Sequence, residues 1–187
     1  VASAFLAKAG LQLLRSDPDM AHDLFDEIVR GDAQAFSARP SDGEGKDVAS
    51  NADSWRLLNE LASADPARTL EGYLKYADGE SEGAVVGAVG RIWGEEDVDS
   101  LRDWVKNREV GDAGNLTAQV SYALSRQDRH DEALDWVRER DLGSATMLHH
   151  LGEWYRVNPS DALTWVESAD LSAEERQHVE TRLGLGK

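Results

Sequence analysis

The stretch Trp165–Leu171, with the sequence WVESADL, decides the fold because the chain repeats it. Close copies begin at Trp104 (WVKNREV) and at Trp136 (WVRERDL), and a weaker copy begins at Tyr73 (YLKYADG). Successive copies are 29 to 32 residues apart. A self-similar period of about 20 to 50 residues is typical of stacked repeats, in which each unit buries its apolar face against its neighbours. We therefore expect each Trp of a Trp-Val step to fill the gap between its own unit and the next.

The segments between these copies carry apolar residues at helical spacing, and none has a convincing strand alternation. Asp-Pro or Asn-Pro steps interrupt the pattern at Asp17, Asp65 and Asn158, where the proline suits the first turn of a new helix. The sequence predicts eleven helices, arranged as five hairpins and a C-terminal helix. The predicted hairpins cover residues 3–30, 53–78, 81–108, 115–140 and 144–168, and the last helix covers residues 172–184.

Residues 31–51 differ from the rest because they are rich in Gly, Ser and Asp and have almost no apolar periodicity. A connection of this length is longer than most links between helices. We predict a mobile loop here, in which only Phe36 and Val48 are suited to anchor the segment.

The composition limits the classes of function. The chain has 187 residues, 41% of them hydrophobic, and no cysteine, which excludes disulfides, thiolate metal sites and cysteine nucleophiles. A net charge of −16 disfavours nucleic acids and anionic membranes as partners, whereas basic partners remain open. No apolar run approaches the roughly 18 residues that span a bilayer, so we expect no membrane insertion. The expected protein is soluble, either cytoplasmic or exported after removal of a leader.

Two stretches resemble pieces of a tetratricopeptide repeat. Residues 128–136 (DRHDEALDW) are similar to the inter-helix turn and second helix of that family, and residues 151–155 (LGEWY) resemble its Leu-Gly-x-x-Tyr element. The family period is about 34 residues, slightly longer than the period of this chain. The resemblance implies that residues 1–187 form one all-α domain, a right-handed α-solenoid of about five stacked hairpins plus the C-terminal helix.

In solenoids of this family the first helix of each hairpin lines a concave groove. The resemblance therefore implies a scaffold or adaptor that binds a protein or peptide through polar residues on those first helices. The expected groove residues are Arg56, Asn59, Arg91, Gln119, Tyr122, Arg126, His150 and Arg156. Arg126 and Arg156 fall near helix ends, where a cation either receives an acidic peptide terminus or stabilises the helix dipole.

Two alternatives belong to other classes of function. The first is a metal-dependent helical enzyme. His149 and Glu153 are four residues apart on one helical face, and Glu174, Glu175 and His178 repeat that geometry on the last helix. The expected ligands of this enzyme are His149, His150, Glu153, Glu175 and His178. The second is an inhibitor whose acidic surface mimics nucleic acid. The chain carries no Gly-x-Ser-x-Gly element, no phosphate loop and no calcium-loop pattern. We therefore expect a protein without a cofactor and without catalytic residues.

Overall fold

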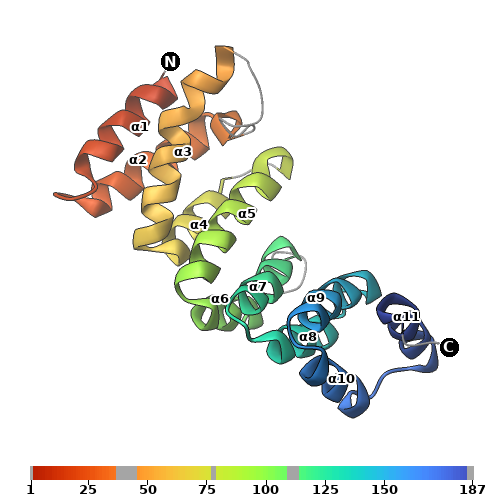
Figure 1. The fold of residues 1–187 in the computed structure, drawn as a ribbon. Helices are drawn as coiled ribbons and strands as arrows, with labels where there is room; N and C mark the ends of the chain where they lie inside the picture. Colours follow the sequence, from red (N-terminus) through yellow and green to blue (C-terminus); the bar gives the residue numbers. More distant parts are fainter. Residues whose placement is uncertain (1, 37–45, 77–78, 109–113, 185–187) are drawn as a thin grey trace. The chain divides into compact units, whose positions relative to one another are not determined.

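The computed structural model describes residues 2–36, 46–76, 79–108 and 114–184. In these ranges the chain is helical and contains no strand, which confirms the prediction of an all-α protein (Figure 1). We predicted one domain from the sequence, whereas the contacts between residues gather into two compact units, residues 1–109 and 110–187. The eleven α-helices of the described ranges fall at the positions of the predicted hairpins and of the C-terminal helix.

The first unit contains three hairpins whose first helices lie side by side. α1 packs against α3, and α3 packs against α5, while each also contacts the second helix of its own hairpin (Figure 1). This pairing lets a helix that is too short to be stable alone bury one face on its partner and another on its neighbour. The elements are α1 (Ala2–Leu13), α2 (Pro18–Gly31), the 3₁₀-helix η1 (Ala33–Phe36), α3 (Lys46–Ala64), α4 (Pro66–Leu74), α5 (Gly79–Glu96) and α6 (Val98–Lys106).

The second unit is built around α9. This helix contacts α7, α8, α10 and α11, so it is in touch with every other helix of the unit. The elements are α7 (Gly114–Arg126), α8 (His130–Glu139), α9 (Ser144–Val157), α10 (Pro159–Ser168) and α11 (Ala173–Leu183). α11 begins with a capping box, in which Ser172 and Glu175 satisfy each other's backbone N–H groups.

Most hairpins turn through one residue that closes the first helix and opens the second. At Asp65 the backbone N–H donates to the carbonyl of Leu61 at 2.8 Å, and the carboxylate accepts from the N–H of Arg68 at 3.0 Å. Asp97 and Asn158 repeat both contacts, and all three corners have φ between −152° and −140° with ψ of 83° to 84°. Because one side chain satisfies donors that would otherwise have no partner, the two helices meet without a loop.

The corner between α7 and α8 departs from this pattern. It is wider, because residues 127–129 separate the helices, and Asp128 adopts a left-handed φ of 59°. Arg129 stands at the N-cap, where its side chain does not cap the backbone N–H groups of α8 but donates to the Glu132 carboxylate at 2.6 and 2.7 Å.

The predicted loop of residues 31–51 is shorter in the structure than in the prediction. α2 runs to Gly31, η1 follows, and α3 already begins at Lys46; residues 37–45 lie outside the described ranges. Phe36 anchors the segment as expected, since it is fully buried and its ring meets those of Phe25, Trp55 and Tyr73 edge-on at 5.6 to 6.0 Å. This aromatic cluster ties η1 to α2, α3 and α4.

The Trp-Val steps at Trp136 and Trp165 are buried, whereas Trp104 is half-buried, and the neighbours of Trp136 and Val137 differ from those we predicted. The indole N–H of Trp136 donates to the carbonyl of Thr117 on α7, within its own hairpin, and Trp165 donates to Asp135 on the preceding hairpin. Val137 belongs to the apolar cluster that it shares with Met147 and Leu151 of the next hairpin. The prediction that the Trp fills the forward gap is therefore corrected for Trp136: its valine neighbour packs forward.

Substitution of Asp65 by Ala should lower the free energy of unfolding by about 1 kcal/mol, because the first turn of α4 loses its cap. Urea denaturation followed by circular dichroism measures the change. Asp65→Asn keeps an accepting oxygen and should retain most of the stability. Equal losses for the Ala and Asn variants would show that the cap does not stabilise this corner.

Substitution of Trp136 by Ala should cost about 3–5 kcal/mol, because its side chain is 2% exposed and its removal leaves a large cavity. Trp136→Phe should cost less, since the ring still fills part of the site while the hydrogen bond to Thr117 is lost. The amplitude and midpoint of the urea transition test both variants. A Trp136→Ala curve superimposable on that of the wild type would refute a core role for this ring.

Candidate binding site between α7 and α9

The eight predicted groove residues fall on first helices of both units. In the first unit, Arg56 and Asn59 are exposed on α3, and Arg91 on α5 is held 3.1 Å from Glu95 in an ion pair. In the second unit α7 carries Gln119, Tyr122 and Arg126, and α9 carries His150 and Arg156.

A pocket of about 470 Å³ opens between α7, the wide corner and α9. Its volume lies in the range of pockets that hold small ligands or anchoring side chains. Three predicted residues meet there, namely Tyr122, Arg126 and His150; Gln119 and Arg156 do not line it. The full lining consists of Tyr122, Ser125, Arg126, Asp128, His130, His149, His150, Glu153 and Val157.

His150 forms the base of the pocket and is 1% exposed. Its Nδ1 lies 2.8 Å from the hydroxyl of Ser125, and its Nε2 lies 3.0 Å from the hydroxyl of Ser121. The Ser121 hydroxyl donates to the carbonyl of Ala118 at 2.8 Å, so it must accept from Nε2–H. The neutral imidazole protonated at Nε2 therefore satisfies both serines, and this chain of hydrogen bonds fastens α9 to α7.

Burial is the main reason why the pKa of His150 is lowered from 6.5 to about 4, and the nearby His149 and His130 add to the effect. Ser125 and His150 stand at the distance of a nucleophile and its general base. However, a serine, rather than a carboxylate, contacts the other ring nitrogen, and an imidazole with a pKa near 4 is a weak base at neutral pH. The geometry thus favours a structural clamp over a catalytic pair.

Aromatic rings form the upper part of the pocket. Tyr122 is 36% exposed, and its ring lies 4.9 Å from that of His150 and 5.7 Å from that of His149. On the opposite side of the wide corner, His130 stacks on Trp154 with the ring planes 19° apart. These contacts hold the rings in fixed positions, while part of the tyrosine side chain remains exposed.

The sequence-based candidates did not include Ser121, Ser125, Asp128 or His130. The two serines are four residues apart on one face of α7, and that spacing is the signal that could have pointed to them. Their pairing with a histidine on another helix depends on tertiary packing. The wide corner positions Asp128 and His130. The only indication of this corner in the sequence is that it lacks the Asp-Pro or Asn-Pro step found at other corners.

The residues of the metal hypothesis do not assemble into one site. Both ring nitrogens of His150 are occupied by serines, and Glu175 is engaged in the capping box of α11. In the described part of the chain, no group of three or more His, Cys, Asp or Glu side chains is placed to hold a metal ion. The proposed di-metal arrangement therefore has no geometric support there.

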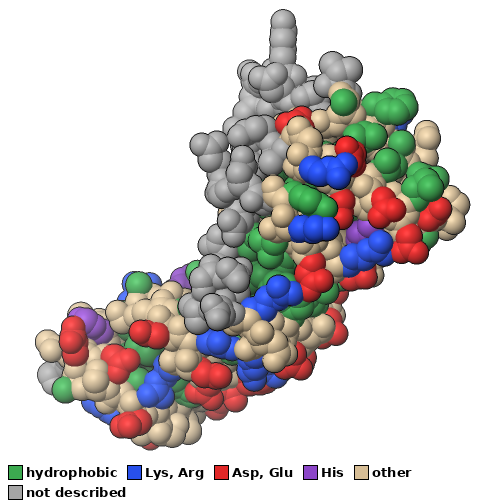
Figure 2. All heavy atoms as spheres, turned by 180° about the vertical axis from the view of Figure 1, so that it is seen from behind, with side chains coloured by type: hydrophobic (Ala, Val, Ile, Leu, Met, Phe, Trp, Pro, Cys, Tyr) green, Lys and Arg blue, Asp and Glu red, His purple; other side chains and the backbone are tan. Residues whose placement is uncertain are grey.

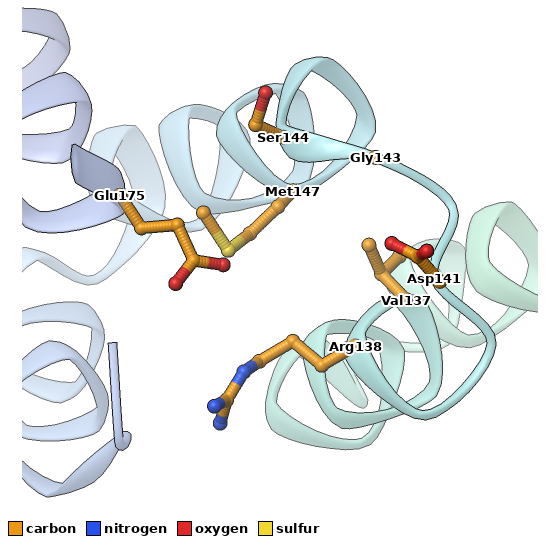
Figure 3. A pocket seen from close by; sticks show the side chains of 7 residues that line it. All are labelled: Val137, Arg138, Asp141, Gly143, Ser144, Met147 and Glu175. Atoms are coloured by element: carbon orange, nitrogen blue, oxygen red, sulfur yellow. The ribbon is translucent and has the colours of Figure 1, made fainter. Parts of the chain in front are cut away.

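A second, smaller pocket of about 230 Å³ lies between α8, α9 and α11 (Figure 3). Two of its charged groups already have partners, since Arg138 donates to the carbonyl of Asp170 at 2.6 Å and Glu175 caps α11. Backbone N–H donation from Ser172 lowers the pKa of Glu175, which keeps this carboxylate ionised. We regard this pocket as part of the seam that holds α11 in place.

Arginines on the surface are largely neutralised by carboxylates. Figure 2 shows Lys and Arg side chains interleaved with Asp and Glu on the face it presents, without a continuous acidic stripe. This face gives no support to the alternative of a nucleic-acid mimic. The ion pairs include Arg30–Glu27, Arg68–Asp19, Arg91–Glu95, Arg102–Asp99, Arg108–Glu71, Arg129–Glu132 and Arg156–Glu153.

No helix in the described ranges is both long enough and apolar enough to cross a bilayer.

The comparison with protein-family models found no match, and the comparisons with curated proteins and with solved structures found none either. We therefore infer the function from the residues of the chain itself.

Acidification should destabilise the second unit through His150. Its folded-state pKa of about 4 is below the ordinary value of 6.5, so the unfolded state binds more protons between these pH values. The free energy of unfolding should fall as the pH drops from 6.5 towards 4, by on the order of 2 kcal/mol at pH 5.

Urea midpoints measured between pH 7.5 and 4.5 test this linkage, with His150→Gln as the comparison. Carboxylates also titrate in this range, so the relevant quantity is the difference between the two curves. A flatter pH dependence in the variant is expected. Parallel curves would show that His150 does not titrate with a lowered pKa.

Proposed function

We propose that this protein is a non-enzymatic α-solenoid module that binds a protein or peptide, and that the pocket between α7 and α9 is a contact site. The observation that carries the proposal is the pocket itself. It has a volume of about 470 Å³, it is lined by the first helices of two successive hairpins, and the Tyr122 ring stands over a buried hydrogen-bonded clamp.

The packing of the helices supports a solenoid within each unit. First helices contact first helices of the next hairpin, as α1 does with α3 and α3 with α5 in one unit, and α7 with α9 and α9 with α11 in the other. Stacked helical hairpins of this kind present a surface of first helices to their partners. Most of the residues that line the pocket belong to the first helices α7 and α9, which supports the proposal.

The chemistry of the pocket favours recognition over turnover. Tyrosine is among the residues that dominate protein interfaces, since it buries a large rigid ring at a small cost in conformational entropy. Because the Ser125–His150–Ser121 chain fixes α9 against α7, the site is preorganised, which reduces the entropy cost of binding. The Ser–His pair lacks a carboxylate partner, which would be needed to stabilise an imidazolium during catalysis.

Selection of random peptides displayed on phage against the purified protein tests the proposal. Enriched peptides should bind the wild type and lose about tenfold or more in affinity on Tyr122→Ala, as for an interface hot spot. Tyr122→Phe, which keeps the ring, and Glu167→Gln on the exposed surface of α10 should bind as the wild type does. Amide chemical-shift changes on binding should centre on α7 and α9.

Thermal unfolding of each variant establishes that it is folded before binding is compared. Enrichment of no peptide, or of peptides that bind the Tyr122→Ala variant unchanged and perturb only second helices, would refute the proposed site.

A further inference from the structure

We infer that the α7–α9 pocket takes a bulky apolar side chain from a partner segment whose flanking residues are Lys or Arg. This inference rests on the proposed function and specifies the chemistry of its ligand. It follows from two observations, the ring-lined interior of the pocket and the net charge of −16 of the chain, to which the exposed Asp128 at the pocket contributes.

The interior suits an apolar anchor. The rings of Tyr122 and His149 meet edge to face at the mouth, and Val157 at the end of α9 is 75% exposed and lines the same pocket. An aromatic or long aliphatic side chain placed there would cover the exposed part of the tyrosine and the valine together. A pocket of about 470 Å³ has room for one such side chain.

The surroundings favour positive charge on either side of the anchor. With 36 acidic and 20 basic residues, carboxylates remain in excess even when every Lys and Arg has a partner. At the pocket, the Asp128 side chain is 92% exposed and is 3.8 Å from His130, which neutralises it only when that ring is protonated. Glu153 faces Arg156 in an exposed pair, an interaction that is weak and exchangeable.

The competing alternative is an acidic peptide terminus bound by Arg126 and Arg156. Arg126 lines the pocket, and Arg156 is in a weak exposed pair with Glu153, which an acidic terminus would have to displace. An acidic segment would also approach a chain of net charge −16, which slows association, whereas a basic segment is steered towards it.

Four short synthetic peptides labelled with fluorescein test the inference by fluorescence anisotropy. Three carry a central tryptophan between pairs of lysines, glutamines or glutamates, and the fourth replaces the tryptophan of the lysine peptide by glycine. The lysine–tryptophan peptide should bind most tightly, and its affinity should fall with rising salt. Loss of the tryptophan or Tyr122→Ala should weaken it about tenfold.

Matched variants separate recognition at the pocket from general attraction by the acidic surface. Asp128→Asn keeps a residue that tolerates the left-handed backbone and removes one charge at the pocket, so it should weaken the lysine–tryptophan peptide several-fold. Glu167→Gln removes the same charge on α10 and should have little effect. Tyr122→Leu removes the ring but keeps an apolar side chain, so it should also weaken the lysine–tryptophan peptide, and it tests the ring independently if the Ala variant is unstable.

The outcomes distinguish failure of this inference from failure of the proposed peptide-binding function on which it rests. Tighter binding of the glutamate peptide with dependence on Tyr122 would overturn the inference and leave a peptide-binding pocket. Equal binding of the tryptophan and glycine forms, unaffected by Tyr122→Ala, would overturn it in favour of non-specific electrostatics. If none of the peptides bound and phage selection also gave no ligand, both the inference and the proposed function would fail.

Discussion

The structure depends on a single constraint, the need of short helices to satisfy their ends and bury their faces at the same time. A helix of 9 or 10 residues, such as α4 or α8, is not stable alone in water. The one-residue corners at Asp65, Asp97 and Asn158 meet the first requirement, because a backbone N–H closes one helix and a side chain opens the next. Contacts between neighbouring first helices meet the second.

The candidate site lies beside a corner that is longer than one residue. Between α7 and α8 the turn takes three residues, and Asp128 adopts a left-handed conformation that asparagine and aspartate accept more readily than most residues. The wider turn brings Asp128 and His130 to the pocket, whose other lining residues come from α7 and α9.

A buried histidine is central to this arrangement because it is neutral. A charged imidazole would be costly where His150 lies, whereas the neutral ring accepts from Ser125 and donates to Ser121. The same burial that lowers its pKa makes it a weak general base at neutral pH, and the two serines occupy both ring nitrogens.

The sequence by itself determined the helical class, the eleven helices and most of their ends, because apolar periodicity and Asp-Pro or Asn-Pro steps are local signals. It also identified Tyr122, Arg126 and His150 as candidates, although by analogy and not through their contacts. Only the tertiary structure decided that Trp136 binds within its own hairpin, that His150 is buried between two serines, and that contacts gather into two units. These features depend on which side chains meet across neighbouring helices, and neither the apolar spacing within each helix nor the repeat itself specifies those pairings.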